Sequence, residues 1–196
     1  MHAATPAADT RLTYDDFLLF PEDGKRHELI DGVHYVAPSP RLRHQDLVGR
    51  LYVAIAAYLV EHPMAGRVFL SPVDVVMSLH DIVVPDLIFV AGDQAAILTE
   101  KNIQGAPALV VEVLSKSTRK RDAQIKRRLF YQAGVREYWL VDPELDTVQV
   151  FRPTAEGRLT RVEELTAEDG GTLATPLLTG FAADIRTLFR PAAEAV

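Results

Sequence analysis

Cysteine is absent from the 196-residue chain, which excludes disulfide bonds and thiolate metal sites. No apolar run approaches the roughly 20 residues that a membrane-spanning helix needs. The first residues lack the charged and apolar regions of a signal peptide. The sequence also has no metal-spaced histidine pair, no phosphate-binding glycine loop and no nucleophile elbow. These absences favour a protein located in the cytoplasm, with no membrane partner.

A general excess of positive charge is also missing, because the formal net charge is −6. The segment 116–128 nevertheless holds seven basic residues and one acid, Asp122. A basic patch on an acidic protein can mark a polyanion site, although a solvated helix face has the same composition. The proportions of hydrophobic (48%) and charged (24%) residues are those of a globular chain. We expect a flexible N-terminus over residues 1–12 and a single domain over 13–196.

Hydrophobic periodicity predicts a fold with both helices and strands. An Asp-Gly pair between apolar runs predicts a hairpin over 27–37. Apolar positions three and four residues apart predict a helix over 43–61. Further periodic runs predict strands over 82–90, 110–114 and 135–141 and a helix over 117–133. This order predicts an α/β or α+β sheet flanked by helices.

Two acidic residues interrupt apolar runs. Glu112 stands among valines and leucines, and Asp86 follows Pro85 inside the run 82–90. An ionised carboxylate in such surroundings is costly unless a metal or a cation compensates its charge. Mg²⁺ prefers one or two carboxylates together with waters and substrate phosphates. The pair therefore predicts a site for Mg²⁺, or for Mn²⁺, and the alternative is a salt bridge from each carboxylate within the core.

The basic helix carries one lysine on its apolar side. At helical spacing, one stripe of the helix consists of Asp122, Ile125, Lys126, Leu129, Phe130 and Ala133. Because the stripe is expected to face the sheet, Lys126 would point inward. An inward lysine could orient a hydroxide nucleophile or offset charge at a scissile phosphate. A structural ion pair of Lys126 with Glu112 or Asp122 explains the pattern equally well.

Five short blocks occur in order along the chain: His27–Gly32, Pro38–Pro40 with His44-Gln45, Val84–Leu87, Val111–Ser115 and Gly134–Pro143. Together they resemble the Uma-two branch of the PD-(D/E)xK nuclease superfamily, a set of bacterial restriction-endonuclease-like proteins. The resemblance implies a restriction-endonuclease-like fold, in which helices flank a mixed β-sheet core. It also implies Mg²⁺-dependent hydrolysis of phosphodiester bonds in DNA.

The resemblance also implies roles for individual residues. Asp86 and Glu112 would be the metal ligands, and Glu28 is the candidate third acid. The superfamily lysine two positions after the glutamate is Leu114 here. We therefore assign the catalytic lysine's role to Lys126, with Lys116 as second choice. The side chains expected to contact the substrate are Lys116, Arg119, Lys120, His44 and Gln45.

The sequence also leaves other functions open. Leu114 and the acidic net charge favour a catalytically inactive module that uses the nuclease fold for nucleic-acid binding or protein assembly. Because the basic patch is short, a phosphodiesterase for RNA or small substrates is a further alternative. A homodimer would supply the two active sites that cutting both strands of a duplex requires.

Overall fold

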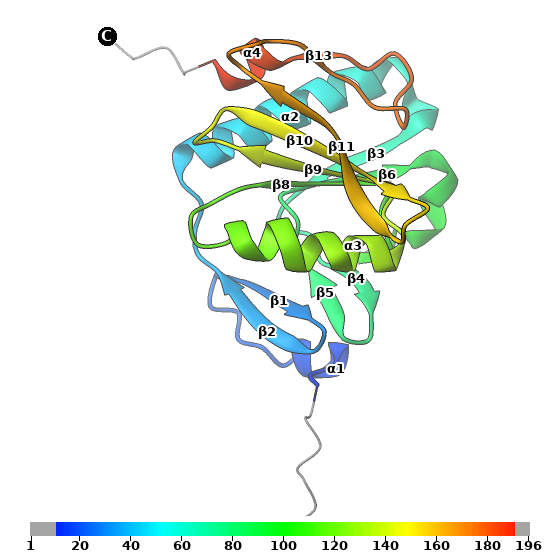
Figure 1. Cartoon of the computed structure of the whole chain (residues 1–196). Helices are drawn as coiled ribbons and strands as arrows, with labels where there is room; N and C mark the ends of the chain where they lie inside the picture. Colours follow the sequence, from blue (N-terminus) through cyan, green and yellow to red (C-terminus); the bar gives the residue numbers. More distant parts are fainter. Residues whose placement is uncertain (1–10, 191–196) are drawn as a thin grey trace, which may run out of the picture.

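The computed structural model of the chain describes residues 11–190, and a six-stranded sheet forms its centre (Figure 1). The strand order is β11-β10-β9-β8-β6-β3; β8 and β9 run parallel, and all other neighbours run antiparallel. Its strands are β3 (Gly66–Leu70), β6 (Leu87–Ala91), β8 (Leu109–Val113), β9 (Glu137–Asp142), β10 (Thr147–Thr154) and β11 (Arg158–Thr166). The predicted mixed sheet with flanking helices is therefore confirmed.

A second sheet of five strands carries the N-terminal hairpin. Its order is β2-β1-β5-β4-β7, and only β4 and β7 run parallel. The predicted hairpin over 27–37 is confirmed, because Asp31 and Gly32 take the positive φ angles (54° and 71°) that a type I′ turn requires. The strands of this sheet are β1 (Arg26–Ile30), β2 (Val33–Ala37), β4 (Val75–Ser78), β5 (Asp81–Val83) and β7 (Ile103–Gln104).

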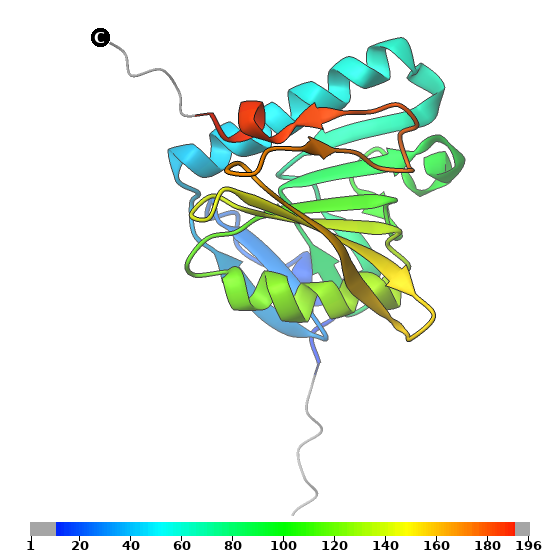
Figure 2. The same cartoon turned by 45° about the horizontal axis from the view of Figure 1, so that its top comes forward.

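Helices cover both faces of the six-stranded sheet. On one face, α2 (Leu42–Glu61) packs Leu51 and Ile55 into a buried cluster with Trp139 of the sheet. On the other face, α3 (Arg127–Ala133) packs Phe130 against Tyr138. Figures 1 and 2 show α2 and α3 on opposite sides of the sheet. The predicted helix over 43–61 is thus confirmed, with its first residue at Leu42.

The remaining elements are short. The helix α4 and the strand β13 pack beside α2, and β12 pairs with β13. The helical turn η1 connects α2 to β3, and η2 connects β6 of the six-stranded sheet to β7 of the five-stranded sheet. The bounds are α1 (Tyr14–Phe17), η1 (Pro63–Ala65), η2 (Gly92–Ile97), β12 (Thr172–Leu173), β13 (Ala183–Asp184) and α4 (Ile185–Phe189).

The alternation of β8 places Glu112 on the side of α3. Val111 and Val113 belong to the cluster under α2, whereas Val110 belongs to the cluster under α3. Since side chains of a strand point to alternate faces, Glu112 shares the face of Val110. Glu112 therefore points toward η3 and α3, where it meets Lys126.

The predicted single strand over 82–90 is wrong. The run divides into β5, which lies in the five-stranded sheet, and β6, which lies in the six-stranded sheet. Pro85 has no N–H to donate to a ladder, so pairing stops there and the chain changes sheets. Asp86 therefore lies in the bend just before β6 rather than within a strand.

The predicted helix over 117–133 forms in part, with a different geometry at its start. Residues 116–118 form a turn, and the π-helical turn η3 (Arg121–Lys126) leads into α3. A π-helix makes i→i+5 bonds, which widen the turn and rotate the side chains relative to an α-helix. The prediction that Ile125 belongs to the inward stripe is wrong, because this side chain is 38% exposed.

The predicted flexible segment over 1–12 falls mostly on residues 1–10, which lie outside the described residues. Within the described part, the Leu12 N–H donates a hydrogen bond to the Gly32 carbonyl, and the Leu12 carbonyl lies 2.8 Å from His80 Nδ1. The Tyr14 N–H donates to the carbonyl of Leu79. The segment that enters α1 is therefore attached to the hairpin sheet.

Candidate active site

A buried lysine joins carboxylates that come from the two main sheets. Lys126 Nζ lies 2.6 Å from Glu112 Oε1 of β8 and 2.7 Å from Glu28 Oε1 of β1. The same atom lies 3.7 Å from Asp122 Oδ1, one turn earlier on η3. All four side chains are at most 4% exposed. The structural ion pair that the sequence left open is therefore present, and it includes Glu28 as well.

Asp86 is held separately, by donors on both of its oxygens. Arg26 Nη1 lies 2.6 Å from Oδ1, His44 Nε2 lies 3.0 Å from Oδ2, and the Val113 N–H donates to Oδ2 at 2.9 Å. Burial raises the pKa of Asp86, but the contacts with His44 and Arg26 outweigh it and lower the pKa to about 2. Asp86 is thus an ionised and oriented carboxylate.

Two carboxylates beside Lys126, those of Glu112 and Asp122, have the opposite tendency. Burial raises the pKa of Glu112 well above its ordinary value, and the neighbouring Asp122 and Glu28 add to this effect against the attraction of Lys126. Burial likewise raises the pKa of Asp122. Burial disfavours the ammonium of Lys126, but the surrounding carboxylates outweigh it and raise its pKa. Lys126 therefore keeps its charge, and protons are held more tightly by these acids than by Asp86.

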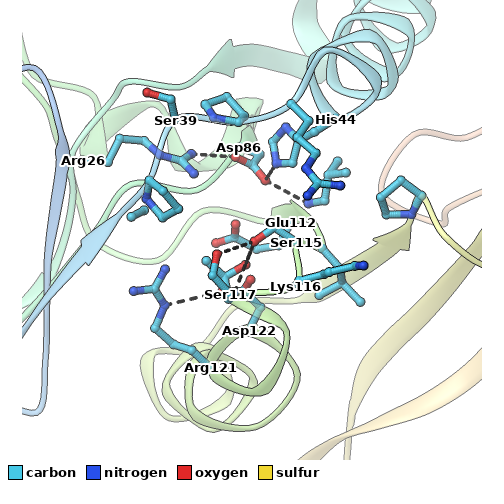
Figure 3. Close-up of a pocket in the computed structure, with 18 of the residues that line it drawn as sticks. Arg26, Ser39, His44, Asp86, Glu112, Ser115, Lys116, Ser117, Arg121 and Asp122 are labelled. Carbon is cyan, nitrogen blue, oxygen red and sulfur yellow. Dashed lines mark hydrogen bonds and ion pairs between the residues drawn. The ribbon is translucent and has the colours of Figure 1, made fainter.

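These residues border one cavity of about 410 Å³. Figure 3 shows Asp86 with Arg26 and His44 on one side, and Arg121 with Asp122 on the helix side opposite. The cavity walls also include the loop before α2 and the turn before η3, over residues 38–41 and 115–118. A cavity in which buried acids meet buried cations is the arrangement expected of an active site.

The residues predicted to contact substrate do not all reach this cavity. His44 and Lys116 line it, and Lys116 is also paired with Glu144 at 3.6 Å. Arg119 instead binds Asp142 and Glu144. Two others, Lys120 and Gln45, are exposed and lie outside the cavity lining; Gln45 borders a separate groove between α2 and α4.

Sequence reasoning missed two arginines of the site, Arg26 and Arg121, which line the cavity. Arg26 lies two residues before Glu28, so strand alternation places both side chains on the same face of β1, and this signal was present in the sequence. Arg121 had no such signal, because α-helical spacing does not place it beside Lys126. Its inward position depends on the π-helical turn.

The oxygen atoms of the cavity fit a hard divalent cation. The described residues contain no ready-made cluster of three or more metal-ligating side chains, since Lys126, Arg26 and His44 contact the carboxylates. However, Glu28 Oε2 and Asp122 Oδ1 are buried without a hydrogen-bond partner in this part of the chain. Mg²⁺ needs only one or two protein carboxylates. Asp86 and Glu112, the two predicted ligands, both line the cavity.

Within residues 11–190, no helix has the length and apolar character required to cross a membrane.

A solved structure and a protein family are similar to this chain. A crystal structure of a protein from Anabaena variabilis, described as a "putative nuclease belonging to DUF820", has 23% identity and a TM-score of 0.75. The match covers 91% of this chain and 97% of that chain, and it shows a shared fold. No curated protein matches the chain. A family model described as "Uma2: Putative restriction endonuclease" matches residues 14–186. Because this match spans most of the chain, the protein belongs to the Uma2 family.

Proposed function

We propose that this protein is a Mg²⁺-dependent endonuclease that hydrolyses phosphodiester bonds in DNA. The observation that carries the proposal is the meeting of Asp86, Glu112 and the buried Lys126 at one cavity. Membership in the Uma2 family supports nuclease-like chemistry at this site.

Asp86 and Glu112 would hold Mg²⁺, and Mn²⁺ is the alternative. Their carboxylates border the cavity from β8 and from the bend before β6, and Glu28 is the third acid. When bound, the metal supplies Lewis-acid activation of the attacking water and of the phosphate. Arg26 and His44 fix the orientation of Asp86 through its two oxygens. Asp86 is therefore oriented before any ligand arrives.

Lys126 would stabilise the negative charge that develops on the scissile phosphate. The residue is 2% exposed, and its ammonium is held by Glu28 and Glu112 at hydrogen-bond distance. A charge that is fixed in a site of low dielectric acts without reorganisation during the reaction. Lys126 thus takes the role that the superfamily assigns to the position of Leu114.

A catalytically inactive nucleic-acid-binding or assembly module is the second candidate. It is favoured by Leu114, and by the engagement of the two metal-ligand candidates with the protein's own cations. The cytoplasmic location, the homodimer and the preference for DNA over RNA stay predictions.

Metal binding and cleavage together test the proposal. Calorimetric titration with Mg²⁺ is compared for the wild type, Asp86→Asn and Glu112→Gln, with Glu156→Gln as a control that removes an exposed acid far from the cavity. We expect binding in the wild type and the control, and loss in both site variants. Nicking of a supercoiled plasmid should follow the same pattern. A folded wild type that binds no Mg²⁺ or Mn²⁺ contradicts the endonuclease, and the inactive module then becomes the leading function.

A further inference from the structure

Arg121 is a nearly buried cation of the cavity to which the proposed reaction assigns no role. Its side chain is 11% exposed, and it lines the cavity from the first residue of η3. The guanidinium carbon lies 5.5 Å from the ring centre of Tyr35, within the range of a cation–π contact. Arg121 is therefore held in place by the hairpin sheet as well as by its own helix.

The hydrogen-bonding capacity of this guanidinium is not used by its neighbours. Its Nε is buried without a hydrogen-bond partner in the described part of the chain. Its Nη2 lies 3.6 Å from Glu28 Oε2, and its Nε lies 3.8 Å from Asp122 Oδ1. Both distances exceed the roughly 2.7–3.2 Å of a hydrogen bond. By contrast, Arg26 binds Asp86 at 2.6 Å.

The π-helical turn is the reason that Arg121 reaches the cavity. In an α-helix, Arg121 and Lys126 would point about 140° apart, since each residue turns the chain by about 100°. The i→i+5 bonding of a π-helix brings residues five positions apart toward the same side. Both side chains are consequently directed at one cavity, and such turns occur often at functional sites.

We propose that Arg121 binds a phosphate group of the substrate, with its guanidinium fork directed into the cavity beside Lys126. This inference rests on the proposed function, because it names the contact that would hold a phosphodiester at the acids. A guanidinium presents parallel N–H donors that match two phosphate oxygens. The nearby Glu28 and Asp122 keep the side chain oriented at a distance that leaves the donors free for that ligand.

Binding of inorganic phosphate tests the inference without any need for activity. Calorimetric titrations with phosphate, at constant ionic strength and with a chelator present, compare the wild type with Arg121→Lys. Arg128→Ala is the matched control, because Arg128 is an exposed cation of the same helical segment and does not line the cavity. We expect Arg121→Lys to weaken phosphate binding at least tenfold and Arg128→Ala to leave it unchanged. Equal binding by Arg121→Lys and the wild type, or no binding by the wild type, overturns the inference.

A salt series with a fluorescein-labelled single-stranded oligonucleotide gives a second readout. Each lost phosphate contact lowers the slope of log K against log salt by about 0.7 for a single strand. Arg121→Lys keeps the charge and can retain this slope, so Arg121→Gln is used here. We expect the slope to fall by about one contact in Arg121→Gln and to stay unchanged in Arg128→Ala. An unchanged slope in Arg121→Gln also overturns the inference.

Two controls separate this inference from the proposed function and from misfolding. If the wild type cleaves no DNA while phosphate binding still depends on Arg121, the endonuclease fails and the phosphate contact stands. Circular dichroism and urea unfolding check each variant. If the Arg121 variants unfold, Tyr35→Leu removes the ring that supports the guanidinium, and it should weaken phosphate binding. Unchanged phosphate binding in folded Tyr35→Leu then counts against the proposed contact.

Discussion

Lys126 Nζ lies 2.6 Å from Glu112 Oε1, although fourteen positions separate the two residues in the sequence. The lysine therefore reaches, from a helix, the glutamate that the superfamily pairs with a lysine on the same strand. Leu114, directly after β8, packs in the apolar cluster with Leu129 and Phe130. In this protein the cation beside Glu112 therefore comes from η3 rather than from position 114.

Replacing this lysine should destabilise the fold in a pH-dependent way. Lys126→Met leaves Glu28 and Glu112 buried without their common cation, which typically costs about 3–5 kcal/mol. Lys126 lowers the pKa of Glu112, so its loss raises that pKa further. A raised folded pKa destabilises the folded state as pH rises, so the defect should be larger at neutral pH than in acid. It should shrink as pH falls through the raised folded pKa of Glu112, because the unfolded pKa is the same in the wild type and the variant. Urea unfolding at several pH values measures this, with Lys120→Met as the exposed control; a defect independent of pH contradicts it.

Asp86 should contribute stability at neutral pH that disappears in acid. Its folded pKa, about 2, is below its ordinary value. The contribution is therefore complete above the unfolded pKa of about 4, and it is lost as pH falls toward 2. The difference between the folded and unfolded pKa values of Asp86 corresponds to about 2 kcal/mol of stability. The groups that face Asp86 are Arg26 and His44. We expect the stability gap between the wild type and Asp86→Asn, measured by urea unfolding in chelator, to narrow between pH 5 and pH 2.5. A constant gap contradicts the shift.

A lysine at position 114, directly after β8, should substitute for the lysine of η3. Leu114 lines the cavity and is 7% exposed, and strand alternation places it on the face of Glu112. We expect Lys126→Met to abolish plasmid nicking, and Leu114→Lys in the same chain to restore part of it. The control is Leu114→Met with Lys126→Met, which carries no new charge and should stay inactive. Equal inactivity of both double variants would show that the helix position cannot be replaced.

Removing an acid at the cavity mouth should strengthen nucleic-acid binding. Glu144 pairs with Lys116 and Arg119, and it competes with a phosphate backbone for these cations. Exposed pairs of this kind are weak, so we expect Glu144→Gln to raise affinity for a labelled oligonucleotide by no more than about fivefold. Glu156→Gln removes the same charge far from the cavity and should change affinity little. Equal gains from both variants would assign the effect to net charge alone.

Much of the fold follows from local patterns. The Asp31-Gly32 turn and the helix α2 are predictable because turn geometry and hydrophobic period depend on neighbouring residues. The strand over 82–90 was predicted wrongly because an apolar run does not reveal that Pro85 moves the chain from one sheet to another. The predicted inward position of Ile125 is wrong because the prediction assumes α-helical spacing, whereas η3 is π-helical.

Part of the candidate site was also predictable from the sequence. Asp86, Glu112 and Lys126 were identified because a buried charge needs a partner. The partners themselves depend on contacts between distant elements: Arg26 binds Asp86 across sixty positions of sequence. Gln45 lies outside the cavity, although it follows His44 directly, because adjacent residues of a helix point in different directions.

Residue type and strand period are enough to predict that acidic side chains are buried in apolar surroundings and require cations. Which cation meets which acid depends on the packing of distant elements. Docking of the β1–β2 hairpin against η3 brings Glu28 to Lys126, and the π-helical turn directs Arg121 into the same cavity. Both outcomes depend on how elements pack across the chain, and packing of this kind leaves no local pattern in the sequence.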